Sequence, residues 1–384
     1  MNDTLPSLDP AAKAVSDQLL ANIKAEIKKS GPISFTRYME LALYTPQLGY
    51  YRNTLKKFGP AGDFVTAPEI SSLFSECVAN QCAEVLEALG GGDILEFGAG
   101  SGMMAADILC ALYKRNQLPK HYYILEVSAF LKSEQAKTIQ AKIPGYFDRV
   151  VWLDALPEKP IRGVIVGNEV LDAMPVHQFT WNKRVKERFV SLENDVLTSC
   201  ISEKENPSLT AHIEKYGIDF ADGYTSEVNL YLPGWMKSIS DCLSRGIALL
   251  MDYGFVRREY YHPDRYTGTI MCHYRHRAHI NPLIFVGVQD ITAHVDFTAV
   301  AESAEENGLT VSGFTNQSAF LINCGLLSFI NDAVDEKSRF LQNQQILQLT
   351  LPSEMGELFK VIALTKNVEI ALMGFSSMNQ MERL

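Results

Sequence analysis

The chain has 384 residues, of which 47% are hydrophobic and 21% charged, the balance of a globular protein with a sizeable core. Its formal net charge of -10 argues against general nucleic-acid binding, because that function needs a basic face. The acidity favours a basic substrate through long-range steering, although surface acidity is also common for solubility alone.

The seven cysteines are odd in number and form no Cys-x-x-Cys pair, so they predict neither a disulfide framework nor a zinc knuckle. A reducing compartment fits this usage. Residues 1–18 carry no secretory or transit signal, and the chain has no uncharged apolar run of about 18 residues. We therefore expect a cytoplasmic protein without a membrane span; its oligomeric state is open, with a dimer as one alternative.

Residues 1–90 are predicted to form an N-terminal segment of helices and loops. Apolar residues recur at helical spacing over 11–29, and a second helix is expected over 33–43 with Ser34 as its cap. Thr66-Ala67-Pro68-Glu69 fits a capping box with proline in the first turn. It predicts one helix that ends at three consecutive glycines, residues 90–92.

Residues 91–370 are predicted to form the main domain, because short apolar runs alternate with helical patterns. The expected strands are 94–97, 122–127, 150–153, 163–167 and 246–251. This alternation predicts an α/β fold with a mostly parallel sheet and right-handed crossovers. Two insertions are expected, 176–245 with a β-hairpin at 178–194 and a helix at 230–244, and a Tyr/His/Arg-rich loop at 255–298.

The last part of the chain is predicted to complete the sheet. A helix is expected over 297–307, a strand near Val311, a helix near 323–332 and a final strand over 358–365. Residues 371–384 are expected to form a loose tail.

The stretch Glu96-Phe97-Gly98-Ala99-Gly100-Ser101-Gly102 follows a strand pattern and precedes a helix pattern. The dinucleotide fingerprint needs a glycine at the sixth position of the glycine motif, where this chain has Met103, and no Lys-Ser or Lys-Thr of a P-loop follows. An acid two residues before Gly-x-Gly-x-Gly resembles motif I of the class I S-adenosylmethionine methyltransferases. The alternative is a glycine-rich bend without a ligand.

Acidic and amide side chains gather where the predicted strands end, and ligands of doubly wound sheets bind beyond the carboxyl ends of strands. The polar residues at these ends are Glu96, Glu126, Asp154, Asn168, Glu169, Asp172 and Asp252. Glu126 is placed to accept from ribose hydroxyls, and Asp154 from an adenine amino group. Helix caps and solvated strand ends are the alternative interpretation of each residue.

A second polar stretch runs from Asn168 to Phe179 directly after the fourth predicted strand. Methyl transfer from a sulfonium depends mainly on position and charge, and a carboxylate such as Glu169 could hold a guanidinium with two hydrogen bonds. His177 could accept a proton or cap a turn. The histidines of 272–279 have no standard zinc spacing and alternate with arginines that repel a cation, so no metal is predicted.

Several blocks of the chain together resemble the MidA-like family of S-adenosylmethionine (SAM)-dependent methyltransferases, the bacterial relatives of the mitochondrial complex I assembly arginine methyltransferase. The blocks are residues 31–51, 62–72, 96–102, 168–179, 274–279, 290–297 and 356–361. The resemblance implies a Rossmann-like class I methyltransferase core with SAM as donor. The mitochondrial members are associated with symmetric dimethylation of an arginine on a complex I subunit. Ala99 departs from the proline expected in many relatives.

We therefore expect a SAM-dependent methyltransferase acting on an arginine of a protein substrate, by resemblance a respiratory complex I subunit. The expected cofactor-binding residues are Thr66, Glu96, Gly98, Gly100, Gly102, Glu126, Asp154 and Asn168. The expected catalytic residues are Asn168, Glu169, Asp172 and His177. The alternatives are a non-catalytic assembly or binding factor that uses residues 255–298 on a partner, and a methyltransferase for a small molecule.

Overall fold

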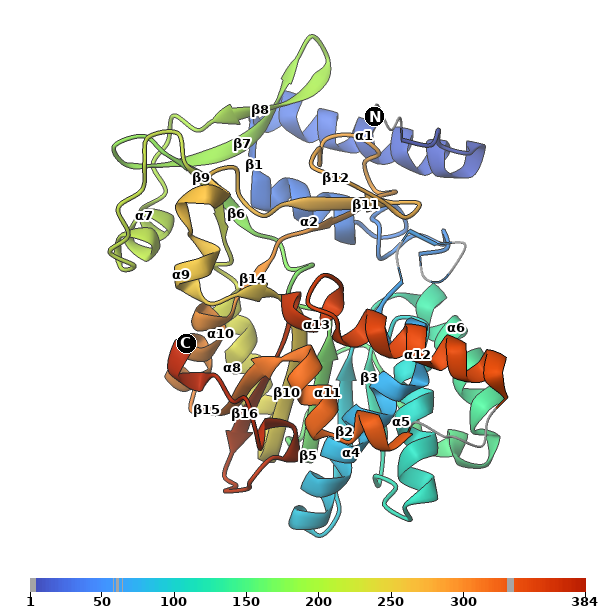
Figure 1. Ribbon diagram of the computed structural model, residues 1–384. Coiled ribbons are helices and arrows are strands. Elements are labelled where there is room, and N and C mark those ends of the chain that lie inside the picture. Colours follow the sequence, from blue (N-terminus) through green and yellow to red (C-terminus); the bar gives the residue numbers. More distant parts are fainter. Residues whose placement is uncertain (1–4, 58, 60–61, 64, 330–334) are drawn as a thin grey trace. The chain divides into compact units, whose positions relative to one another are not determined.

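The computed structural model describes residues 5–57, 59, 62–63, 65–329 and 335–384 (Figure 1). The chain forms two compact units, each assembled from three segments. Unit 1 is drawn from 1–64, 172–231 and 258–294, and unit 2 from 65–171, 232–257 and 295–384. The segment 1–90 that the sequence suggested is therefore divided between the units at residue 64.

Unit 2 contains the main sheet, which has eight strands among the described residues. Its spatial order is β15 (Thr310–Asn316), β16 (Phe359–Lys366), β10 (Leu243–Phe255), β5 (Ile161–Asn168), β2 (Asp93–Phe97), β3 (Tyr122–Leu125) and β4 (Val150–Leu153), and β14 (Val295–Asp296) also pairs with β10. Strands β4, β3, β2, β5 and β10 are parallel neighbours, whereas β16 runs antiparallel to β10 and β15. This arrangement, with helices around the sheet (Figure 1), confirms the predicted Rossmann-like α/β class.

The core of unit 2 explains why the sequences of these strands are continuous apolar runs. Residues 247–251 of β10 and 164–166 of β5 are all buried, as parallel strands covered on both faces require. The same apolar cluster includes residues of α4 (Ser72–Leu89), α5 (Met103–Lys114) and α11 (Gln317–Asn323). The remaining helical elements of this unit are α3 (Ala67–Ile70), α6 (Ala129–Lys142), η1 (Pro144–Arg149), α8 (Leu232–Cys242), α10 (Phe297–Glu306), η3 (Leu326–Phe329), α12 (Glu336–Thr350), α13 (Met355–Leu358), η4 (Met373–Phe375) and η5 (Met381–Arg383).

Unit 1 combines helices with two smaller antiparallel sheets. One sheet has the order β1 (Ile33–Ser34), β7 (Val185–Glu193), β6 (His177–Trp181) and β9 (Thr225–Val228), with β8 (Val196–Ile201) also paired to β7. The other has the order β12 (Arg277–His279), β11 (Met271–Tyr274) and β13 (Asp290–Thr292). The helices are α1 (Pro10–Ser30), α2 (Phe35–Tyr44), α7 (Pro207–Glu214) and the short η2 (Pro263–Arg265). The first residue of α9 (Arg257–Tyr260) belongs to unit 2 and the rest of this helix to unit 1. The predicted helices at 11–29 and 33–43 and the hairpin at 178–194 are confirmed, with Ser34 as cap of α2.

The single helix predicted after residue 66 is wrong, because the chain breaks between α3 and α4. Ser71 is extended, with a φ of -157°, and its hydroxyl caps α4. Thr66 precedes α3 but makes no side-chain capping hydrogen bond. Glu69, the other half of the expected capping box, instead accepts a hydrogen bond from Ser101.

Two further expectations near the C-terminal end need correction. Helix α11 ends at Asn323, where the predicted helix near 323–332 was to begin, and only the 3-10 turn η3 follows; residues 330–332 lie outside the described residues. The tail is not loose, because Phe375 packs on Phe320 with ring centroids 5.7 Å apart. The backbone N–H of Gln380 also donates to the carbonyl of Phe314 at 2.7 Å.

All seven cysteines are free thiols. Within the described ranges, no helix has the length and apolarity to span a bilayer. Those same ranges contain no group of three or more His, Cys, Asp or Glu side chains arranged to hold a metal ion.

Candidate functional site

The candidate site lies at the carboxyl ends of the central strands of unit 2. From β2 the chain proceeds outward through β3 and β4, and then returns to place β5 and β10 on the other side of β2. The strand order therefore reverses between β2 and β5, the position where doubly wound sheets bind ligands. The predicted glycine motif directly follows β2, and the predicted polar stretch begins at the end of β5.

The glycine turn, residues 98–102, follows β2 and uses glycine for its backbone conformation. Gly98, Gly100 and Gly102 have φ values of 63°, 53° and 83°, all in the left-handed region that side chains disfavour. At Gly102 a Cβ would also lie 2.9 Å from the Cα of Gln135. The glycine is therefore required both by conformation and by the close approach of α6.

Gln135 connects the glycine turn to the end of β3, and sequence reasoning missed it. Its Nε2 donates to the carbonyl of Gly100 at 3.1 Å and to Glu126 Oε2 at 3.0 Å. Its Oε1 accepts from the indole N–H of Trp152 at 3.0 Å. Gln135 is fully buried, so these hydrogen bonds fix its amide and, through it, the Glu126 carboxylate. No local pattern within α6 distinguishes this glutamine from a surface one.

The two acids predicted to bind the nucleoside have different surroundings. Burial raises the pKa of the Glu126 carboxyl, although hydrogen bonds from the Ser128 N–H and from Gln135 act in the opposite direction. Asp154 is 91% exposed and forms an ion pair with Lys132 at 2.5 Å. An exposed pair of this kind is weak and can exchange for another partner.

Glu96 is buried at the end of β2, with only 1% of its surface exposed. The Tyr122 hydroxyl donates to its Oε2 at 2.7 Å. Desolvation raises the pKa of Glu96 to about 7, the Tyr122 hydrogen bond lowers it, and the neighbouring Glu126 charge raises it. Its role as a cofactor contact stays a prediction.

The acid turn, residues 168–171, follows β5 and contains a strained glutamate. Glu169 has a φ of 53°, a conformation that costs a non-glycine residue about 1 kcal/mol or more. Its N–H donates to the Met251 carbonyl at 2.9 Å, and its Oε1 accepts from Asn168 Nδ2 at 3.1 Å. The Oδ1 of Asn168 is buried and, among the residues that the structure describes, accepts no hydrogen bond.

Asp252, near the carboxyl end of the neighbouring strand β10, holds the acid turn in place. Its Oδ2 accepts from the N–H groups of Val170 at 3.1 Å and Leu171 at 2.8 Å. Asp252 is buried, and the sequence placed it at a strand end without a role. A carboxylate that accepts several backbone N–H groups is the kind of support that keeps a strained residue in one conformation.

The four predicted catalytic residues do not form one cluster within a unit. Asn168 and Glu169 are neighbours in unit 2, whereas Asp172 and His177 belong to unit 1. His177 begins β6 and its Nδ1 lies 2.7 Å from Glu187 Oε1. The carbonyl of the buried Asp172 accepts from the N–H of Ala293 at 3.0 Å. The catalytic roles of these two residues stay predictions.

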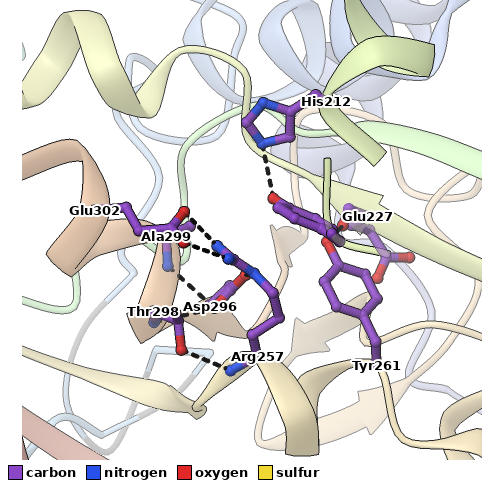
Figure 2. Close-up of polar contacts among 9 residues, drawn as sticks. His212, Glu227, Arg257, Tyr261, Asp296, Thr298, Ala299 and Glu302 are labelled. Carbon is purple, nitrogen blue, oxygen red and sulfur yellow. Dashed lines mark hydrogen bonds and ion pairs between the residues drawn. The ribbon is translucent and has the colours of Figure 1, made fainter. Parts of the chain in front are cut away.

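Figure 2 shows a further ionic cluster of unit 2 that the sequence did not reveal. Arg257 follows β10, and its guanidinium donates to both carboxylate oxygens of Glu302 at 2.6 and 2.9 Å. It also donates to Asp296 at 3.1 Å, and its backbone N–H donates to the hydroxyl of Thr298 at 2.9 Å. The cluster therefore fastens the start of α10 to the end of β10.

Comparison with known proteins shows the family to which the chain belongs. A model of a family of S-adenosyl-L-methionine-dependent methyltransferases matches residues 77–315, more than half of the chain. A Burkholderia thailandensis protein whose crystal structure contains S-adenosyl-homocysteine is 39% identical, with a TM-score of 0.95 over 99% of this chain and 100% of that one. A native crystal structure from the same organism is 40% identical, with a TM-score of 0.92 and the same coverage.

Two curated relatives add names to the comparison. The Drosophila melanogaster protein arginine methyltransferase NDUFAF7 homolog, mitochondrial, is 28% identical over 405 residues, covering 94% of this chain and 88% of its own. The Homo sapiens protein arginine methyltransferase NDUFAF7, mitochondrial, is 28% identical over 391 residues, covering 93% and 85% respectively.

The residues of unit 2 fit the cofactor of this family. Helix α5 begins at Met103, with Gly102 as its N-cap, and has no acid in its first turn. The Met103 N–H donates to the Ser101 hydroxyl at 3.4 Å, and the N–H groups that follow can receive the carboxylate of SAM. The Glu126 carboxylate, with about four acceptor positions, can accept ribose hydroxyls in addition to its two present donors. The cofactor is SAM, and the chain belongs to the MidA-like family of SAM-dependent methyltransferases.

Proposed function

We propose that this methyltransferase acts on the guanidinium group of an arginine in a protein substrate and that it produces the symmetric dimethyl product. The single observation that carries the proposal is the acid turn, which holds the Glu169 carboxylate at the carboxyl end of β5 in a strained conformation. The relatives named protein arginine methyltransferases, matched over nearly the whole chain, support the same acceptor.

When bound, SAM supplies an electrophilic methyl group on its sulfonium sulfur. The chain's own residues then position the acceptor nitrogen. A carboxylate and a guanidinium form two parallel N–H···O bonds, so Glu169 would fix both the position and the plane of the guanidinium. The nitrogen that gains the methyl group must release one proton, and a carboxylate beside it stabilises the developing charge until water accepts that proton.

The neighbouring side chains would hold Glu169 in position for this role. The N–H groups of Val170 and Leu171 are held by Asp252, and the Asn168 amide donates to Glu169 Oε1. The buried Asn168 Oδ1 can accept a further donor from a ligand. The expected cofactor contacts Thr66, Gly98, Glu126 and Asp154 belong to the same proposal.

The proposal is tested by incubating purified protein and labelled SAM with a protein lysate, and then identifying the labelled product by mass spectrometry. The resemblance to complex I assembly proteins makes a complex I subunit the first defined substrate to include. We expect label on arginine, with the fragment ions of symmetric dimethylarginine. Label confined to small molecules would favour a metabolite methyltransferase, and SAM binding without any transfer would favour a non-catalytic assembly factor.

Glu169→Gln is the matched variant, because it keeps the size of the side chain and removes its charge. We expect transfer to fall by about 100-fold or more while S-adenosylhomocysteine binding stays within a few-fold, since the lost interaction is with the acceptor. Glu158→Gln, at an exposed position after β4, is the control and should leave both unchanged. Transfer that survives in Glu169→Gln would make Glu169 structural.

A further inference from the structure

A hydrogen bond connects α3 to the glycine turn, and none of the proposed cofactor or acceptor contacts uses it. The hydroxyl of Ser101, the residue between Gly100 and Gly102, donates to Oε1 of Glu69. Glu69 is partly buried, and its second carboxylate oxygen accepts no hydrogen bond within the part of the chain that the structure describes. A carboxylate with a vacant oxygen therefore touches the turn that receives the cofactor.

The amino-acid end of SAM carries two opposite charges, and the turn itself suits only one of them. The first N–H groups of α5 and the positive end of its dipole attract the carboxylate. The same field repels the α-ammonium group, which must find an anionic or carbonyl acceptor nearby. A carboxylate is the strongest such acceptor.

The other acids near the turn accept hydrogen bonds from groups that lie outside the turn. Glu96 is buried and accepts from Tyr122 at 2.7 Å. Glu126 accepts from Ser128 and Gln135 at the end of β3, on the side assigned to the ribose. Asp107, on α5, pairs through Oδ1 with Lys142 at 2.6 Å, and its buried Oδ2 accepts no hydrogen bond among the described residues. Among these acids, Glu69 is the one that accepts directly from a side chain of the turn, Ser101.

We propose that Glu69 binds the α-ammonium group of SAM, while Ser101 holds its other oxygen and so fixes the direction of the carboxylate. The inference rests on the cofactor and is independent of which acceptor is methylated. It also explains why the Thr-x-x-Glu sequence does not close as a capping box, because Glu69 is directed to the glycine turn.

The test compares two ligands in two proteins by isothermal titration calorimetry. S-adenosylhomocysteine carries the ammonium group, and its deaminated analogue keeps the carboxylate and the nucleoside but lacks that group. In the wild-type protein we expect S-adenosylhomocysteine to bind at least about tenfold more tightly than the analogue, since a charge-assisted hydrogen bond is lost. In Glu69→Gln we expect this preference to fall to about twofold, with analogue affinity unchanged.

Two further variants separate binding from support of the turn. Ser101→Ala removes the hydroxyl but keeps the Glu69 carboxylate, and should lower the affinity for S-adenosylhomocysteine by no more than about threefold. Glu76→Gln, on α4, removes a similar charge at a position away from the turn and should leave the affinity for both ligands unchanged. The proposal would be overturned if Glu69→Gln lowered the affinity for both ligands equally, or if Ser101→Ala lowered the affinity for S-adenosylhomocysteine as much as Glu69→Gln does. It would also be overturned if the wild-type protein bound the two ligands with equal affinity.

Discussion

The glycine turn and the acid turn of unit 2 both contain residues with a left-handed backbone conformation, but they use different residue types for it. The glycine turn has glycine at its three left-handed positions, and glycine adopts a positive φ readily. The acid turn places a glutamate there and needs Asp252 to hold the residues that follow. The glycine turn therefore adopts this conformation without strain, whereas the acid turn retains the strain of Glu169 and adds a hydrogen-bonded support.

The glycine turn should be the less tolerant of a single added methyl group. Gly102→Ala combines a φ of 83° with a Cβ placed 2.9 Å from the Cα of Gln135. We expect the free energy of unfolding to fall by about 3 kcal/mol or more, and S-adenosylhomocysteine binding to be lost. Urea unfolding and calorimetry measure both effects.

Gly145→Ala is the control for this variant, because nothing lies within 4 Å of a Cβ built at Gly145. We expect its free energy of unfolding to stay within about 0.5 kcal/mol of the wild type. Wild-type ligand affinity in Gly102→Ala would show that α6 can move aside, and the comparison between the turns would lose its basis.

The next largest effect concerns the buried acid that precedes the glycine turn. The pKa of Glu96 is raised from 4.5 to about 7, so the folded state holds a proton that the unfolded state has already released. This contribution to stability is complete below pH 4.5 and is lost as pH rises to about 7. Over that interval the wild type should lose up to about 3 kcal/mol relative to Glu96→Gln.

Urea unfolding of both proteins at several pH values between 4 and 8 measures this difference, and the other titrating groups cancel in the comparison. Glu96→Gln keeps an oxygen that can accept from Tyr122, so its core should remain intact. A constant difference between the two stability curves would mean that the pKa of Glu96 is the same in the folded and unfolded states.

The acid turn should respond to loss of its support with a moderate change in stability and a larger one in transfer. Asp252→Ala leaves the N–H groups of Val170 and Leu171 without their acceptor, which should cost about 2 kcal/mol. We expect S-adenosylhomocysteine affinity within about threefold of the wild type and a fall in kcat. Asp148→Ala, at an exposed position of unit 2, provides the control. An unchanged kcat would remove the link between Asp252 and the transfer step.

The smallest change in stability is expected at the strained residue itself. Glu169→Gly relieves the left-handed conformation but makes the unfolded chain more flexible, so the free energy of unfolding should rise by no more than about 1 kcal/mol. Transfer should be lost, because the carboxylate is gone. A clear loss of stability in thermal and urea unfolding would mean that the Glu169 side chain serves the fold, and the contrast with the glycine turn would weaken.

The fold class and the glycine turn could be predicted from the sequence, because both are local. Apolar runs alternating with helical patterns define the parallel sheet, and the positive φ values at Gly98, Gly100 and Gly102 are the usual use of such glycines. The turn after β5 was also found, since its polar residues directly follow a buried strand.

The supports of the site could not be predicted, because they depend on contacts between distant residues. Asp252 reaches Leu171 over 81 positions, and Gln135 reaches Gly100 over 35. The capping box failed for the same reason: Glu69 has a stronger partner in Ser101, 32 residues away, than in its own helix. Propensity and spacing describe what a residue can do locally, and tertiary partners decide between the alternatives.

The position of β16 has a consequence for the synthesis of the protein on the ribosome. Residues 359–366 form the strand between β10 and β15, although they are translated after both neighbours. Until they emerge, the apolar strand β10 has an open edge of unpaired backbone groups, which is a template for aggregation. A nascent chain stalled or terminated before residue 359 would carry the glycine turn and the acid turn on an unfinished sheet, so we expect chaperones to be needed during this interval more than for the folded protein.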